Sequence, residues 1–218
     1  MKKAIVTFGT GTHAELLKIA TPSYKAFAHL HGYDFHIAEQ IGKARPAPWY
    51  KVRCLQALLE EYDIAVFFGC DMVVVDGTED FDLPPLDEWT QAMVAHNTGD
   101  GHVPNTDMWI VNQKMKPWLD KCWALDKYIM HGWWEQAALM ELMGYEPDVR
   151  PTYCRDIYNE LYSMTYFLDN GWNVHLWDQQ IPDHYRGPAR IQHATMHPDR
   201  AAVMRQWAVE AERGWMCE

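Results

Sequence analysis

The sequence has few cysteines, no long apolar run and no excess of basic residues. Its five cysteines are scattered and form no C-x-x-C pair, which argues against a zinc site or disulfide framework and favours a reducing compartment. No apolar run approaches the ~18 residues of a membrane span, and the run at residues 4–8 is broken too early, at Gly9, for a signal peptide. The net charge of −11 argues against nucleic acid and anionic membranes as partners. We therefore expect a cytoplasmic protein without a membrane span.

What the chain does contain is enough apolar sequence for a real core. Hydrophobic residues make up 48% of its 218 residues. No Ser/Gly-rich linker, repeat or low-complexity tract divides it, so residues 1–218 are expected to form a single domain. The chain also has eleven tryptophans and eleven tyrosines. More than half of these should fill the core, but their flat faces with a polar handle also suit sugar rings.

Short apolar runs alternate with helical patterns along the chain. Strands are predicted at residues 4–8, 33–38, 64–68, 92–95, 108–112 and 173–177, with an extended piece at 191–197. Helices are predicted at residues 14–30, 49–61, 116–128, 132–143 and 198–211, whereas 153–169 could not be assigned. The early alternation indicates parallel strands joined by right-handed crossovers. The expected fold class is α/β, with a Rossmann-like, mostly parallel central sheet flanked by helices.

One carboxylate stands out after the most apolar strand. Ile64 to Phe68 is continuously apolar, as a central strand buried on both faces should be, and Asp71 follows before a second apolar run. A carboxylate buried there without a partner would be costly, so we expect Asp71 to meet a cation, a donor or water. Open α/β sheets bind ligands in the crevice beyond their strand ends. Alternatively, Asp71 caps a turn and Asp76 begins a loop.

A series of short segments follows one order along the chain: residues 32–35, 48–51, 58–62, 69–71, 105–112, 133–136 and His193. Together they resemble the nucleotide-sugar domain of the Golgi-type galactosyl-, xylosyl- and mannosyltransferases. In that family the matching motifs are H-G-Y, W-x-K, a leucine-rich helix, a strand ending in D-x-D, N-T-G, W-W-D-Q and a late histidine. The resemblance spans roughly residues 4–197 and implies a GT-A fold. The family's N-terminal membrane anchor is not seen, so a soluble relative is expected.

The resemblance also implies an activity. It implies transfer of a sugar from a nucleoside diphosphate sugar, with a UDP-sugar favoured, to a glycan or other hydroxyl acceptor, with retention of the anomeric configuration. Asp71 and His193 would bind Mn²⁺ or Mg²⁺ beside the leaving diphosphate. Glu135 and Gln136 would be the catalytic residues near the sugar. The residues implied to bind the nucleotide sugar are Thr7, Phe8, Gly9, Lys51, Asp71, Asn105 and Asp107.

Several of these residues also have simpler interpretations. Glu135 alternatively caps a helix, Lys51 is alternatively a solvated helix lysine, and Asn105 alternatively makes an Asx turn. The Gly9–Thr12 turn is not a G-x-G-x-x-G motif and fits an ordinary strand-to-helix turn. The other histidines are expected on the surface or in polar loops, with His96 and His102 flanking a loop that would close over the acceptor. These histidines are His13, His29, His31, His96, His102, His131, His175 and His184.

The sequence departs from the family at the metal site. Gly69 stands where the first D-x-D aspartate would be, and Asp107 stands where N-T-G has glycine. Weak cation binding is therefore expected, or a metal-independent reaction that uses Arg or Lys, with Asp76 and Asp107 as reserve carboxylates. His197 or Arg200 would replace the family's late lysine. The alternatives are a non-catalytic nucleotide-sugar or carbohydrate-binding protein that kept the fold, and a hydrolase that acts on the same donor.

Overall fold

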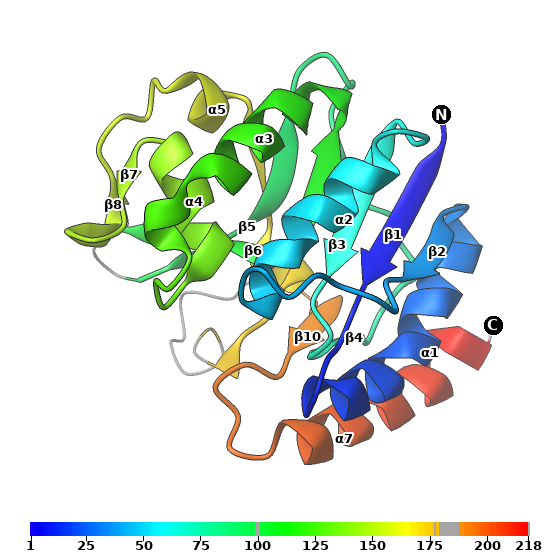
Figure 1. Ribbon diagram of the computed structural model, residues 1–218. Helices are drawn as coiled ribbons and strands as arrows, with labels where there is room; N and C mark the ends of the chain where they lie inside the picture. The colour runs from blue at the N-terminus through cyan, green and yellow to red at the C-terminus, as the bar shows by residue number, and fades with distance from the viewer. Residues whose placement is uncertain (99–100, 177, 179–187, 218) are drawn as a thin grey trace.

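The structure is a computed structural model, and it describes residues 1–98, 101–176, 178 and 188–217. The central sheet has six strands in the order β2-β1-β3-β6-β5-β9 (Figure 1). They are β1 (Lys3–Thr7), β2 (Asp34–Ile37), β3 (Ile64–Phe68), β5 (Gln91–Asn97), β6 (His102–Asn112) and β9 (Thr165–Leu168). β6 runs antiparallel to β3 and β5, and the other neighbouring pairs are parallel. The predicted mostly parallel α/β sheet is confirmed.

Helices cover both faces of β3, which is why its apolar run is continuous. Phe68 packs into the cluster on one face, and Phe67 packs into the cluster on the other, because successive side chains of a strand point to opposite faces. The first cluster includes residues of α1 (His13–His31) and α7 (Arg200–Arg213), which lie side by side (Figure 1). The second includes residues of α2 (Tyr50–Leu58), α3 (Lys116–Ala124) and α4 (Trp134–Leu142).

A small ribbon continues from the end of β3 and joins distant parts of the chain. It consists of β4 (Met72–Val74) and β10 (Ile191–His193), which run antiparallel. Met72 and His193 are partners in its register, and the Ala194 amide donates to the Asp71 carbonyl at 2.8 Å. This pairing brings Asp71 next to His193 although more than half of the chain separates them in sequence.

The C-terminal half contains the main differences from the sequence-based elements. The helix predicted at residues 198–211 is confirmed as α7. The strand predicted at 173–177 is wrong, because Val174 forms only an isolated bridge to Gln192, and residue 177 lies outside the described residues. Within the described residues, this half also contains β7 (Tyr145–Glu146), β8 (Arg150–Cys154) and α5 (Glu160–Ser163). Among the described residues, the helices lack the length and apolar character that a bilayer crossing needs.

The turn between β3 and β4 is held by a buried tyrosine of α1. The Tyr24 hydroxyl oxygen lies 2.5 Å from the Gly69 carbonyl oxygen and 2.8 Å from the Met72 carbonyl oxygen. Burial and the nearby Cys70 and Asp71 raise the pKa of Tyr24 well above its usual value, so the hydroxyl keeps its proton and remains a donor. The turn that presents Asp71 is therefore fastened to the first helix.

Tyr24→Phe is expected to lower the free energy of unfolding by about 1–3 kcal/mol, because two buried carbonyls lose their donor. Tyr158, which is 88% exposed, provides the matched control, and Tyr158→Phe should change stability by less than about 0.5 kcal/mol. Urea unfolding followed by tryptophan fluorescence measures both. If Tyr24→Phe and Tyr158→Phe have the same free energy of unfolding, the Tyr24 hydroxyl does not hold the turn.

Candidate active site

The predicted site residues gather at one edge of the sheet, where β1 and β3 end. These strands are parallel, with Val6 opposite Phe67, so the residues that follow them lie side by side. β6 enters from the opposite direction, and the Gly69 amide donates to the Asp107 carbonyl at 2.6 Å. The residues after β1, the β3–β4 turn and Asp107 therefore share the edge at which open α/β sheets bind ligands.

Asp71 is buried and faces two groups that can carry positive charge. Its Oδ2 accepts a hydrogen bond from Arg200 Nη1 at 3.0 Å, and its Oδ1 lies 3.4 Å from His193 Nε2. Burial alone would raise the pKa of Asp71, but the positive charges of His193 and Arg200 hold it well below the usual range. Asp71 is therefore a carboxylate. Of the two residues considered in place of the late lysine, Arg200 reaches Asp71, whereas His197 packs edge-on against Trp207.

The proton position on His193 follows from a chain of hydrogen bonds that starts at the backbone. The Asp107 amide donates to Asn105 Oδ1 at 2.8 Å, so that atom is an acceptor, and Asn173 Nδ2 donates to it at 3.1 Å. Asn173 Oδ1 therefore faces His193 Nδ1, at 2.9 Å, and Nδ1 carries the proton. In the neutral imidazole this arrangement leaves the lone pair on Nε2, which points toward the carboxylates.

His193 Nε2 lies between two acidic side chains. It is 3.4 Å from Asp71 Oδ1 and 3.7 Å from Asp107 Oδ2, it is buried, and it has no hydrogen-bond partner among the described residues. Burial lowers the pKa of His193, but the negative charge of Asp71, with Asp107, more than offsets this and raises the pKa overall. The position therefore favours positive charge, whether this comes from a proton or from a metal ion.

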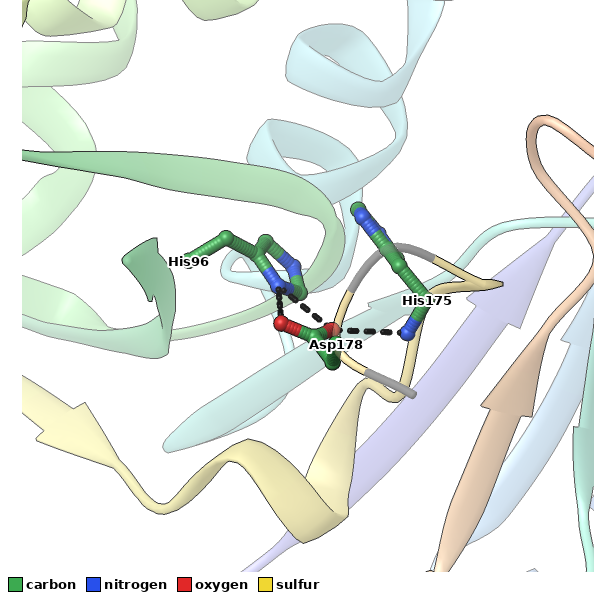
Figure 2. Close-up of side chains that lie close together, drawn as sticks. All are labelled: His96, His175 and Asp178. Atoms are coloured by element: carbon green, nitrogen blue, oxygen red, sulfur yellow. Dashed lines mark hydrogen bonds and ion pairs between the residues drawn. The ribbon is translucent and has the colours of Figure 1, made fainter. Parts of the chain in front are cut away.

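A second buried polar cluster supports His193. Figure 2 shows its three members: Asp178 accepts from His96 Nδ1 at 3.0 Å and from the His175 backbone amide at 2.8 Å, and the imidazole rings stack with centroids 3.6 Å apart. One ligand atom from each residue lies within 4.8 Å of the others, so the cluster could hold a metal ion. His175 Nε2 also contacts His193 Nδ1 at 3.0 Å, and burial keeps the pKa of His175 well below its usual value.

The prediction that His96 and His175 lie on the surface or in polar loops is wrong, because the ring stack and Asp178 replace water around them. His102 is half-buried and contacts the Tyr162 hydroxyl at 3.1 Å. His13 and His29 are exposed, as predicted. His184 lies outside the described residues.

Lys51 is the centre of a buried ionic cluster behind Asp107. Its Nζ lies 2.8 Å from Asp107 Oδ1 and 2.8 Å from Glu135 Oε1. Burial lowers the pKa of Lys51, but the two carboxylates raise it above that of a free lysine, so the cation persists at neutral pH. Lys51 is 4% exposed, which excludes the alternative of a solvated helix lysine.

Glu135 and Gln136, in the first turn of α4, both contact Thr106. The Thr106 hydroxyl donates to Glu135 Oε1 at 2.9 Å, and the Thr106 amide donates to Gln136 Oε1 at 3.3 Å. Burial raises the pKa of Glu135 more than Lys51 lowers it. Trp134, just before them, has a φ of +43°, a conformation that tryptophan rarely adopts. The Glu135 side chain contacts Lys51 of α2 and Thr106 of β6. These contacts differ from the helix capping that was the alternative interpretation of Glu135.

The remaining predicted residues lie along the same edge. Thr7 is buried and its hydroxyl has no hydrogen-bond partner in the described ranges, while the Phe8 ring packs against Phe67 at 5.4 Å between centroids. A Cβ on Gly9 would lie 2.6 Å from the His13 carbonyl oxygen, so glycine allows α1 to begin there. Asn105 does make the alternative Asx turn, through Asp107, and it joins the His193 network as well.

Two other features lie away from this edge. Asp71 precedes β4, whereas Asp76 follows its other end. The Asp76 carboxylate accepts a hydrogen bond from the Thr78 hydroxyl at 2.8 Å, as expected for an aspartate that begins a loop. A hollow of about 540 Å³ opens beside α4 and β7, with Lys127, Glu141 and Arg155 in its lining. None of the predicted site residues lines it. This hollow is therefore distinct from the predicted donor site.

The sheet order, the flanking helices and the site at the strand ends define the GT-A fold of glycosyltransferases, and comparison with solved structures confirms this prediction. The chain is similar to a glycosyltransferase involved in the glycosylation of the major capsid of PBCV-1, with 14% identity and a TM-score of 0.67 over 95% of this chain and 99% of that one. It is also similar to the galactosyltransferase LgtC in complex with donor and acceptor sugar analogs, with 12% identity and a TM-score of 0.59 over 96% and 95% of the two chains.

A third similar structure is the apo form of the glycosyltransferase GlyE of Streptococcus pneumoniae TIGR4, with 14% identity and a TM-score of 0.59 over 98% of this chain and 63% of that one. No protein-family model and no curated protein sequence matches the chain. Because all three identities are low, the likeness establishes the fold, and the activity has to be argued from the site.

Proposed function

We propose that this protein is a glycosyltransferase that moves a sugar from a nucleoside diphosphate sugar, a UDP-sugar in the first instance, to a hydroxyl of a glycan or other acceptor. The main support is that the ionised Asp71 lies 3.4 Å from His193 Nε2, which accepts or donates no hydrogen bond within the part of the chain that the structure describes, at the ligand-binding edge of a GT-A fold. The similar solved structures are glycosyltransferases, and LgtC was solved with donor and acceptor sugar analogs.

The donor set at this edge fits Mn²⁺ or Mg²⁺. Hard divalent cations favour carboxylate oxygens, and Mn²⁺ also accepts an imidazole nitrogen. Asp71 supplies the carboxylate, and His193 supplies a buried nitrogen to which no described residue hydrogen-bonds. When bound, the cation would neutralise the diphosphate as it leaves.

The neighbouring residues have roles that follow from their exposure. The Arg200 guanidinium is partly exposed beside Asp71, where it would bind a phosphate oxygen. Gln136 is half-buried and accessible, so it would face the sugar, whereas the buried Glu135, which contacts Lys51 and Thr106, would act from behind it. Thr7, Phe8, Gly9 and Asn105 would border the nucleotide and the donor sugar. Retention of the anomeric configuration remains part of the proposal. All five cysteines are free, which agrees with the proposed cytoplasmic location.

A thermal-shift panel of nucleotide sugars with Mn²⁺ tests the proposal. A donor at about 100 times its Kd should stabilise the fold by about 2.7 kcal/mol, which corresponds to roughly 5–11 °C for a chain of this size. The controls are the free sugar, the nucleoside alone and each donor with a chelator in place of Mn²⁺. No shift with any nucleotide sugar would contradict the proposal.

Gly69 supports a second candidate, a binding protein that kept the fold, because the residue at that position supplies no carboxylate. An assay with the radiolabelled donor selected by the panel separates the possibilities. Transfer to an acceptor indicates a transferase, and tight donor binding without turnover indicates a binding protein. Turnover that no acceptor accelerates indicates a hydrolase.

A further inference from the structure

The first observation is that Asp107 faces the same histidine nitrogen as Asp71. Its Oδ2 lies 3.7 Å from His193 Nε2, compared with 3.4 Å for Asp71 Oδ1. His193 is 1% exposed, and its Nε2 makes no hydrogen bond to any residue that the structure describes. Two carboxylates and a lone pair repel one another when nothing positive lies between them. The three groups therefore form a donor set that a cation would stabilise.

The second observation is that Asp107 lies next to Gly69, on the neighbouring strand. The Gly69 amide donates to the Asp107 carbonyl at 2.6 Å. A Cβ on Gly69 would lie 3.1 Å from Asp107 Cβ and 3.3 Å from Asp71 Oδ1. A side chain at residue 69 would therefore crowd Asp107, and the space beside the β3–β4 turn is used by a residue of β6 instead.

The third observation is that the two oxygens of Asp107 have different partners. Oδ1 accepts from Lys51 Nζ at 2.8 Å, and Oδ2 is turned toward His193. The Asp107 amide is held by Asn105 Oδ1 at 2.8 Å. The Asp107 side chain remains 35% exposed, so Oδ2 is accessible to a ligand while Lys51 fixes its direction.

We propose that Asp107 is a third protein ligand of the divalent cation, that it supplies the carboxylate which residue 69 lacks, and that Lys51 orients it. This inference rests on the proposed function, since the cation is the one assigned to Asp71 and His193. Gly69 and Asp107 would then be linked. The carboxylate is supplied from β6 instead of from the end of β3, and glycine at residue 69 leaves room for the Asp107 side chain. We call this pair of residues the exchange. The site would then hold a cation without a complete D-x-D motif.

Direct binding of Mn²⁺ to the full chain tests the inference without an activity assay. The electron paramagnetic resonance signal of free Mn²⁺ gives the Kd for the parent protein and its variants. Asp107→Asn keeps the size of the side chain and an oxygen for Lys51, and it should weaken Mn²⁺ binding by about 10- to 100-fold. Asp76→Asn, at the far end of β4, is the matched control and should leave the Kd unchanged. A Kd for Asp107→Asn equal to that of the parent overturns the inference.

The exchange itself is tested by reversing it. Asp107→Gly should lose Mn²⁺ affinity, and adding Gly69→Asp should restore most of it, because Asp107 Cβ, the nearest atom to a Cβ on residue 69, is then gone. The metal-free melting temperature shows whether each variant is folded. A folded double variant that binds Mn²⁺ no better than Asp107→Gly overturns the exchange.

Asp71→Asn separates this inference from the proposed function. If Asp71→Asn abolishes Mn²⁺ binding and Asp107→Asn leaves it intact, the proposed cation site stands, and Asp107 is only a partner of Lys51. If neither variant weakens Mn²⁺ binding, the cation is not bound at this edge, and the proposed site and the inference both fail.

Discussion

Asp71→Asn should abolish cation-dependent donor binding, with Mn²⁺ affinity reduced by more than about 100-fold, since changes to outer-shell partners alone cost about 10–100-fold. The effect should exceed that of Asp107→Asn for a structural reason. The Asp71 side chain is 12% exposed and lies 3.4 Å from His193 Nε2, whereas the Asp107 side chain is 35% exposed and lies 3.7 Å from the same atom. Isothermal titration of UDP into the protein, with and without Mn²⁺, measures the loss.

The control for this prediction is a second aspartate on the same ribbon. Asp76→Asn also removes one negative charge, but at the end of β4 remote from His193, so its UDP and Mn²⁺ affinities should match those of the parent. The metal-free melting temperature confirms that both variants are folded. Equal losses in the two variants would mean that general charge, and not coordination by Asp71, explains the effect.

Lys51→Met should lower the free energy of unfolding by about 3–5 kcal/mol, because it leaves two carboxylates near each other without their cation. Glu135 is 1% exposed and would keep only the Thr106 hydroxyl as a donor to its side chain. For a chain of this size the loss corresponds to a melting temperature lower by roughly 6–20 °C. Urea unfolding provides the free energy, and calorimetry provides the temperature.

Two further variants show whether charge burial is the cause. Lys116→Met breaks an exposed pair with Glu60, 3.2 Å apart, and should cost less than about 1 kcal/mol. Adding Glu135→Gln to Lys51→Met should recover part of the stability, since one of the unpaired buried charges is removed. If Lys51→Met is as stable as Lys116→Met, the cluster contributes little to the fold.

The sheet and the position of Asp71 were predictable because they depend on local pattern. The apolar run at residues 64–68 requires burial on both faces, and the carboxylate that follows must then lie at a strand end. Lys51 was left undecided between a site role and solvent. Its burial depends on the facing carboxylates of Asp107 and Glu135, which come from β6 and α4 and are not visible from the helix itself.

The support for His193 could not be predicted, because it depends on pairing between distant segments. His193 was assigned through family resemblance, and its approach to Asp71 requires the β4–β10 register. His175 was misjudged because a lone polar residue near an aromatic segment shows no periodicity, and its burial comes from stacking on His96. Asn173 was missed for the same reason. It was counted as part of a strand, whereas its amide fixes the tautomer of His193.

The β4–β10 ribbon has a consequence for biosynthesis. β4 is translated in the first half of the messenger RNA, and β10 is translated near its end. A ribosome-bound nascent chain can therefore form most of the central sheet before β10 emerges. Until then Asp71 lacks both His193 and Arg200. The proposed cation site would therefore be completed only late in translation, and a stalled chain that ends before residue 190 would lack it, together with the α7 residues that pack in the core with α1.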